Sequence, residues 1–299
     1  MNWQQYRTAQ IRRSININIL CVHFKMSNKA KELNLTLNEF NPLKQLKPNR
    51  NILILGSAGS GKSHLLKHLL SYVSVPFAVL INPTEFADNF YGRILPDQCK
   101  LEELTDSVLE KICNRQKNLC KWMQKHPEVT IDPTACLVMD KCEPDLIDLK
   151  WARNPSFKFL FRSGKAAHIN MIFSANYPLP IPPQYLPEID YVFILNETNP
   201  THRKTLWKMF GGRFKDYKQF EKVMEKITAD KYYAMVIDMT KTSGKLDQHI
   251  FFYKAPAEIP ERYLGCKNLY RICVGNDITF HDLLEKPFDL YRKHDTPDH

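Results

Sequence analysis

The chain has 299 residues, of which 43% are apolar, and it carries a formal net charge of +10 with a pI of about 9.1. This length fits one large α/β domain or a domain with appendages, and the apolar fraction excludes a chain that is disordered throughout. The sequence has no apolar stretch that is long and uncharged enough to predict a membrane span. The basic charge suits a polyanionic partner, and a solvated basic surface is the alternative explanation.

The eight cysteines form no Cys-x-x-Cys pair. They therefore predict reduced thiols in an intracellular protein and no zinc ribbon. Residues 1–25 contain three arginines and no acidic residue. This composition is compatible with a mitochondrial presequence, but asparagines interrupt its apolar stretch. We favour a disordered extension over residues 1–34, with Met26 as a second candidate start.

Short apolar runs alternate with polar or helical stretches along most of the chain, which predicts a mostly parallel sheet with helices on both faces. The expected strands cover 52–55, 77–81, 135–139, 169–175, 191–195, 234–237 and 250–253. Helical spacing of apolar residues predicts helices over 64–73 and 101–125. The last two strands are expected to form a hairpin at the sheet edge. The predicted domain covers 35–265, and the weaker pattern of 266–299 predicts a loosely held tail.

The first predicted strand leads directly into a P-loop pattern and then into a helical pattern. Its residues are Gly56, Ser57, Ala58, Gly59, Ser60, Gly61, Lys62 and Ser63. Glycines let the backbone amides surround phosphates, and the helix N-terminus attracts the same negative charge. We expect Lys62 to reach the β- and γ-phosphates and the hydroxyl of Ser63 to bind Mg²⁺. A glycine-rich turn without a ligand is the alternative.

Two polar residues follow later predicted strands. Asp140 ends the apolar run Cys136–Met139, which is typical of the carboxylate that binds Mg²⁺ in P-loop proteins. Asn176 follows the strand over 169–175 and is a candidate for sensing the γ-phosphate or orienting water. Each residue is also an ordinary polar end to a strand, so the P-loop upstream is what favours the functional interpretation.

Several sequence blocks together resemble the genome-packaging ATPases of large DNA viruses, virophages and polinton-type elements, which belong to the FtsK–HerA superfamily. The resemblance runs from about Leu35 to about Gly265 and depends on the order and spacing of the blocks. They are Pro48-Asn49-Arg50, Asn82-Pro83-Thr84-Glu85, Asn114-Arg115-Gln116, Val138-Met139-Asp140-Lys141-Cys142 and Tyr177-Pro178-Leu179-Pro180-Ile181-Pro182-Pro183.

This resemblance implies a P-loop NTPase fold of the additional-strand (RecA/FtsK-like) type, with ATP and Mg²⁺ as cofactors. It implies a homo-oligomeric ring that pumps double-stranded DNA through contacts with the DNA backbone, with capsid vertex proteins as further partners and no membrane. The implied location is the host cytoplasm or nucleus, with association with the virion as an addition.

The chain departs from the family pattern at positions that matter for hydrolysis. Lys141 replaces a second carboxylate, Lys165 stands where an arginine acts on a neighbouring subunit, and Asn176 replaces a glutamine. An expected arginine after the proline loop is Leu186. Lysine keeps the charge of arginine but loses its planar fork. We therefore expect nucleotide binding to be retained and hydrolysis to be weakened.

Hydrolysis would be retained if a carboxylate at another position acted as the catalytic base. Glu85 follows the second predicted strand, where some related P-loop enzymes keep the catalytic glutamate, although Thr84-Glu85 is equally consistent with a helix cap. Glu143 and Asp145 are less well-placed alternatives on the sequence alone.

Two groups of basic residues are candidates for contact with the DNA backbone, and solvated helix faces are the alternative for any one lysine. The groups are Lys117, Lys121 and Lys125, and His202, Arg203, Lys204, Lys208, Arg213 and Lys215. The leading hypothesis is thus a DNA-packaging ATPase. Its rivals are a nucleotide-binding structural or regulatory protein derived from such a motor, and a P-loop kinase, for which no acceptor-binding lid is recognisable.

Overall fold

A computed structural model describes residues 37–291 except 149, 177, 179, 180, 243 and 275–277. The predictions for the extension over 1–34, for the presequence and for Met26 lie outside the described residues, as does part of the proline-rich loop. In the described part of the chain, no helix is both long enough and apolar enough to cross a bilayer.

One sheet of nine strands forms the centre of the described residues, in the order β1-β9-β8-β7-β2-β6-β5-β3-β4. Only β8 is antiparallel to its neighbours β7 and β9. The strands are β1 (Asn38–Glu39), β2 (Asn51–Leu55), β3 (Phe77–Ile81), β4 (Lys100–Leu101), β5 (Ala135–Met139), β6 (Ile169–Ala175), β7 (Tyr191–Ile194), β8 (Tyr233–Asp238) and β9 (Ile250–Lys254). Every residue of β2, β3, β5, β6 and β7 is buried, as expected for parallel strands covered on both faces.

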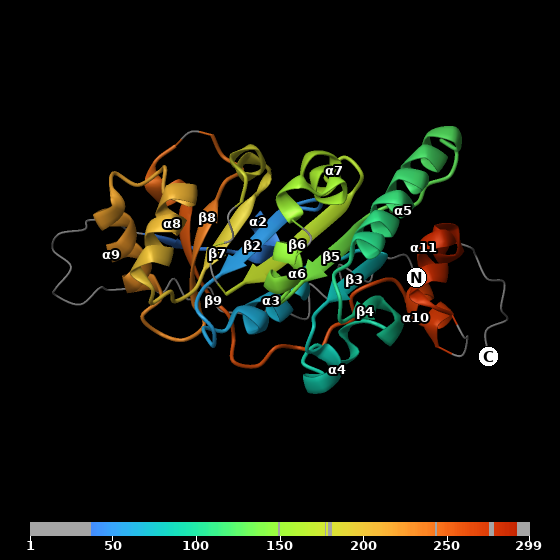
Figure 1. Cartoon of the computed structure of the whole chain (residues 1–299), viewed down its shortest axis with the longest axis horizontal. Coiled ribbons are helices and arrows are strands. Elements are labelled where there is room, and N and C mark those ends of the chain that lie inside the picture. The colour runs from blue at the N-terminus through green and yellow to red at the C-terminus, as the bar shows by residue number, and fades with distance from the viewer. Residues whose placement is uncertain are drawn as a thin grey trace. The chain divides into compact units, whose positions relative to one another are not determined.

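Helices connect and cover these strands (Figure 1). The α-helices are α2 (Pro42–Gln45), α3 (Lys62–Leu70), α4 (Glu85–Asp88), α5 (Asp106–Lys125), α6 (Glu143–Asp148), α7 (Pro155–Ser163), α8 (Pro200–Phe210), α9 (Tyr217–Ile227), α10 (Lys267–Cys273) and α11 (Phe280–Glu285). Short 3₁₀ helices cover Gly92–Ile94, Asp97–Cys99, Trp151–Arg153, Pro183–Glu188, Leu246–Gln248 and Pro287–Tyr291.

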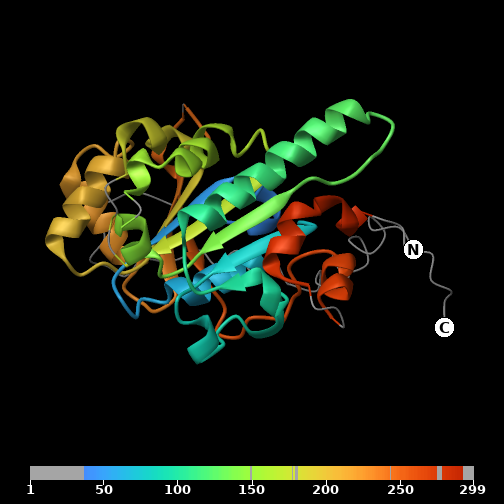
Figure 2. The same cartoon turned by 45° about the vertical axis from the view of Figure 1, so that its right-hand side comes forward.

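Helix α3 connects β2 to β3, toward the β4 edge of the sheet. Helices α5 and α7 connect β3 to β5 and β5 to β6, back in the opposite direction. Because such crossovers are right-handed, α3 covers one face, and α5 and α7 lie together on the other (Figures 1 and 2). Strand β6 lies between β2, which precedes the P-loop, and β5, which precedes Asp140. This inserted strand defines the additional-strand type, and the mostly parallel sheet flanked by helices confirms the predicted fold class.

The structure differs from the expected elements at two places where pairing is long-range. Leu101 pairs with Ile81 in the short strand β4, so the helix expected from 101 begins only at Asp106, where the side chain of Thr105 caps it. Strand β1 was not expected; it pairs with β9 and so covers the edge that the β8–β9 hairpin was predicted to form.

The segment after residue 265 packs more closely than the loosely held tail that the sequence predicts. In its described part, Leu269, Leu284 and Leu290 are buried. Helix α11 lies against α5, and the hydroxyl of Tyr291 donates to the carbonyl of Asp132 at 2.8 Å. Helices α10 and α11 have only seven and six residues, so their apolar periodicity is too short to recognise from sequence.

Candidate functional site

The P-loop joins β2 to α3 as predicted, and two of its glycines have the left-handed backbone that such a loop needs. Gly59 has φ 74° and Gly61 has φ 100°, a conformation that other residues rarely adopt. A side chain added at Gly59 would meet no atom within 4 Å, so open space lies above this part of the loop. Ala58 and Gly59 are exposed, and the first turn of α3 follows directly.

Lys62 is the first residue of α3, and its side chain folds back into the loop. Its Nζ donates to the carbonyl oxygens of Gly56 at 3.0 Å and Ser57 at 2.9 Å, and only 6% of the residue is exposed. Burial lowers the pKa of the Lys62 ammonium, and the negative charges of Glu143, Asp140 and Glu197 oppose that shift, with Glu143 contributing most. The nearby carboxylates thus partly offset the effect of burial on this ammonium.

The register of the sheet brings the predicted polar residues to one edge. Leu55 is paired with Ala175 on one side and with Ile194 on the other, so Gly56, Asn176 and the loop after β7 share that edge. Because β5 pairs in parallel with β6, Asp140 reaches the same edge. The residues that the sequence placed at strand ends therefore surround the P-loop.

Asp140 is fully buried and both oxygens of its carboxylate accept hydrogen bonds. Oδ2 accepts from the hydroxyl of Tyr91 at 2.8 Å, and Oδ1 accepts from the hydroxyl of Ser174. Burial and the neighbouring carboxylates raise the pKa of Tyr91 well above its usual value, so this phenol stays a donor. Sequence reasoning missed Tyr91 and Ser174, because their role depends on tertiary contacts.

Glu143 lies closer to the P-loop chemistry than its sequence position indicated. It is the first residue of α6, only 3% of it is exposed, and its Oε1 accepts the backbone N–H of Asn176. This bond joins the tip of β6 to the segment after β5. Among the carboxylates that act on Lys62, Glu143 has the largest effect. Asp145, the other sequence alternative, instead accepts the backbone N–H of Leu104 at 3.2 Å.

Glu85 is buried in a local network at the start of α4. Its carboxylate accepts the backbone N–H of Tyr91 at 3.1 and 3.2 Å and the amide of Asn82 at 3.3 Å. Lys100 Nζ lies 3.9 Å from its Oε1. Glu85 thus holds the turn that carries Tyr91. Its link to Asp140 is indirect, because the hydroxyl of Tyr91 donates to Asp140.

Lys141 and Lys165, at which the resemblance implies other residues, make their contacts outside the P-loop. Lys141 has a left-handed backbone with φ 59°, and its Nζ donates to Thr84 at 2.8 Å and lies 3.3 Å from Asp88 Oδ2. Lys165 Nζ lies 3.0 Å from Asp190 Oδ2. Asp190 directly precedes β7, at the edge of the sheet opposite the P-loop, so Lys165 lies away from the P-loop of its own chain.

Glu197, a buried acid on the loop after β7, is hydrogen-bonded to the P-loop. It was not singled out from the sequence. The Oε1 of Glu197 accepts from the hydroxyl of Ser57 at 2.8 Å and from the backbone N–H of Asn199 at 2.8 Å. The backbone N–H of Ser57 donates to the carbonyl of Asn196 at 2.9 Å. The polar run Asn196–Asn199 after a predicted strand was the available signal.

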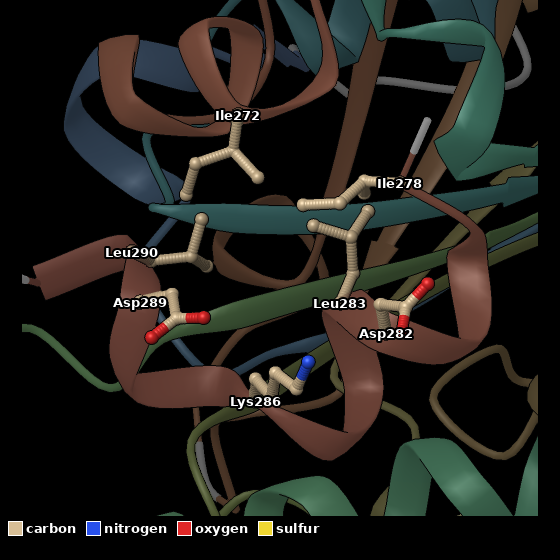
Figure 3. Close-up of a pocket in the computed structure, with 7 residues that line it drawn as sticks. All are labelled: Ile272, Ile278, Asp282, Leu283, Lys286, Asp289 and Leu290. Carbon is tan, nitrogen blue, oxygen red and sulfur yellow. The ribbon is translucent and has the colours of Figure 1, made fainter. Parts of the chain in front are cut away.

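A cavity of about 190 Å³ lies apart from this site, between the C-terminal helices (Figure 3). It is lined by Ile272, Ile278, Asp282, Leu283, Lys286, Asp289 and Leu290. These residues belong to α10, α11 and the segments that flank them, far along the chain from the P-loop. Among the described residues, no group of three or more His, Cys, Asp and Glu side chains is arranged to hold a metal ion by itself.

Comparison with known proteins identifies relatives in large DNA viruses. Protein 088R of Invertebrate iridescent virus 3 is 30% identical over 246 residues, which cover 80% of this chain and 90% of that protein. The chain belongs to the same family. Another relative, a protein of Acanthamoeba polyphaga mimivirus, is 29% identical over 208 residues, covering 69% of this chain and 72% of its own. No family model matches the chain.

The solved structures that align with this member of the viral family include the genome packaging NTPase B204 of Sulfolobus turreted icosahedral virus 2. The alignment has a TM-score of 0.48 and 16% identity, and it covers 71% of this chain and 99% of B204. The resemblance to proteins of large DNA viruses, stated from the sequence, is confirmed by these relatives.

Proposed function

We propose that this protein is an ATPase of the viral DNA-packaging type, which couples ATP hydrolysis to the movement of double-stranded DNA into a capsid as a ring oligomer. The observation that carries the proposal is the placement of the buried Lys62, Asp140 and Glu143 around the P-loop at one edge of the sheet. A phosphate-binding loop alone serves many proteins, whereas two buried carboxylates beside its lysine suit metal binding and water activation.

The loop fits the phosphates of ATP in shape and charge. Open space above Gly59 leaves room for a phosphate chain, and the amides of the first turn of α3 face the same space. Lys62 would exchange its two carbonyl partners for phosphate oxygens, which are stronger acceptors for an ammonium. Burial of this cation against two carbonyl oxygens supports the same assignment.

Ser63 and Asp140 fit Mg²⁺ that arrives with the nucleotide. Magnesium in such enzymes takes one or two protein oxygens together with phosphates and waters, so a set of two protein ligands suits it. When bound, Mg²⁺ neutralises charge on the β- and γ-phosphates. Tyr91 and Ser174 hold the carboxylate of Asp140 in place by donating to its two oxygens.

Glu143 is the residue we assign to water activation, in place of Glu85. Its Oε1 is held by the backbone N–H of Asn176, which leaves its second oxygen to accept a proton from the attacking water. Asn176 follows β6 beside the P-loop and would orient the γ-phosphate or this water. Lys165 would act in trans, since it lies at the opposite edge of its own sheet.

The proposed DNA contact rests on exposed lysines rather than on every basic residue of the two groups. Lys117, Lys121 and Lys125 are exposed along α5 at the i, i+4 spacing of one helix face. By contrast, Arg203 binds Glu225 and the carbonyl of Glu197, so its guanidinium supports the loop after β7. Contacts with phosphates that ignore base sequence suit a protein that moves along DNA. Such a protein would work inside the host cell and meet capsid vertex proteins.

A catalytically weakened nucleotide-binding protein derived from such a motor is the second candidate. It is favoured by Lys141, which stands where the resemblance implies a second carboxylate. The ammonium of Lys141 instead lies against Asp88. Under this alternative, ATP binds with Mg²⁺ but the protein serves as a structural or regulatory subunit.

Double-stranded DNA of mixed sequence should stimulate ATP turnover by the full-length protein. Replacing Lys117, Lys121 and Lys125 by alanine should raise the DNA concentration for half-maximal stimulation by at least about tenfold near 0.1 M salt, since each phosphate contact releases counterions. The matched control replaces Lys44, Lys47 and Lys245, three exposed lysines outside α5. This variant should change the DNA concentration for half-maximal stimulation little. Absence of stimulation in the wild type would contradict the packaging function.

A further inference from the structure

Tyr232 lies at the edge of the P-loop in a conformation that needs an explanation. It directly precedes β8 and has a left-handed backbone with φ 69°, and 36% of the residue is exposed. A bulky residue rarely adopts this conformation, and such outliers gather at ligand sites. Among the described residues, few other aromatic side chains are as exposed; Phe86 and Tyr263 are examples.

The ring of Tyr232 lies against the first turn of α3. The ring centroids of Tyr232 and His64 are 4.8 Å apart and their planes are tilted by 40°. A methyl group at Gly61 would come within 3.1 Å of the Cδ1 atom of Tyr232. His64 itself is fixed by a 2.6 Å hydrogen bond between its Nε2 and the carbonyl of Pro256. The ring of Tyr232 therefore lies beside the P-loop, against a histidine that is itself hydrogen-bonded.

The order of the strands indicates on which side of the P-loop the base of a bound nucleotide would lie. Asp140 and Glu143 follow β5, which lies on one side of β2, whereas β7 and β8 lie on the other. Because β8 is antiparallel to β7, the residue before β8 reaches the same edge as the P-loop. The carboxylates mark the γ-phosphate end of the site, so the nucleoside leaves the loop on the side of His64 and Tyr232.

We propose that Tyr232 stacks against the base of the bound nucleotide, an inference that rests on the proposed ATP site. The exposed part of its ring offers an apolar surface, and His64 and Gly61 hold it beside the amides that would bind the inner phosphates. Stacking on an aromatic side chain accepts any base, because each base has a π-face. Tyr232 thus adds affinity for a nucleoside triphosphate over a bare phosphate chain.

The test compares ATP with inorganic tripolyphosphate, each titrated with Mg²⁺ into the full-length protein by calorimetry. Tyr232→Ala should weaken ATP binding by about tenfold, the range expected for loss of one stacked base, and leave tripolyphosphate binding unchanged. Tyr232→Phe keeps the ring and should bind ATP like the wild type. Tyr263→Ala is the matched control, because Tyr263 is 68% exposed and its neighbour Arg262 contacts Ser71 at the far end of α3.

Two results would overturn the proposal while leaving the phosphate site intact. Equal weakening of ATP and tripolyphosphate by Tyr232→Ala would mean that the ring only shapes the P-loop. Unchanged binding of both ligands would mean that the base lies elsewhere. A wild-type protein that binds neither ligand would instead overturn the nucleotide site itself, so the two failures are distinguishable.

Discussion

Replacing Glu143 by glutamine should reduce ATP hydrolysis by at least about a hundredfold, the low end of what a general base contributes, and leave ATP affinity nearly unchanged. Glutamine has the same shape and keeps an oxygen that can accept the backbone N–H of Asn176, but it cannot take a proton from water. Steady-state phosphate release and ATP titration on the same preparation measure the two effects separately.

The matched control for Glu143→Gln is Glu85→Gln, since both carboxylates are buried and both changes remove one charge. Glu85 accepts the backbone N–H of Tyr91, so its replacement should lower the melting temperature and reduce turnover only partly. The assignment would be overturned if Glu85→Gln stopped hydrolysis without loss of stability and Glu143→Gln remained active. That outcome would restore Glu85 as the base.

Replacing Lys62 by alanine should abolish the stabilisation of the fold by ATP. A ligand at a hundred times its dissociation constant adds about 2.7 kcal/mol to the free energy of unfolding, which thermal unfolding detects readily. The fold should persist, because the partners of Lys62 Nζ are the two loop carbonyls of Gly56 and Ser57. Unfolding curves with and without Mg²⁺ and ATP should differ for the wild type and coincide for the variant.

Lys67→Ala provides the control for the Lys62 experiment. Lys67 belongs to the same helix and its Nζ donates to the carbonyl of Phe90 at 2.5 Å, away from the loop carbonyls. This variant should keep the full response to ATP. If ATP stabilised Lys62→Ala as strongly as the wild type, the P-loop would not be the binding site.

The parts of the fold that local pattern determines were predictable from the sequence. The bounds of β3, β5 and β6 match the predicted strands residue for residue, because buried parallel strands are continuous apolar runs. The P-loop was also predictable, since its glycines, lysine and flanking elements are contiguous in the chain. Asp140 and Asn176 could each be placed at the end of a strand, because each directly follows an apolar run.

Features that depend on contacts between distant residues were not predictable. The place of Glu143 follows from the left-handed turn at Lys141 and from the hydrogen bond to Asn176, neither of which leaves a sequence signal. Tyr91 reaches Asp140 across 49 positions of the chain. The buried leucines of α10 and α11 gain their partners from α5 and from neighbouring segments, so their short helices resembled a loose tail.

The rate of phosphate release from ATP by the full-length wild-type protein with Mg²⁺ tests the central claim most directly. The placement of Lys62, Asp140 and Glu143 together at the P-loop predicts many turnovers per protein molecule, at a rate well above that of the Glu143→Gln variant. Tight binding of ATP with phosphate release no faster than in that variant would contradict the claim and favour the weakened, regulatory descendant of a motor.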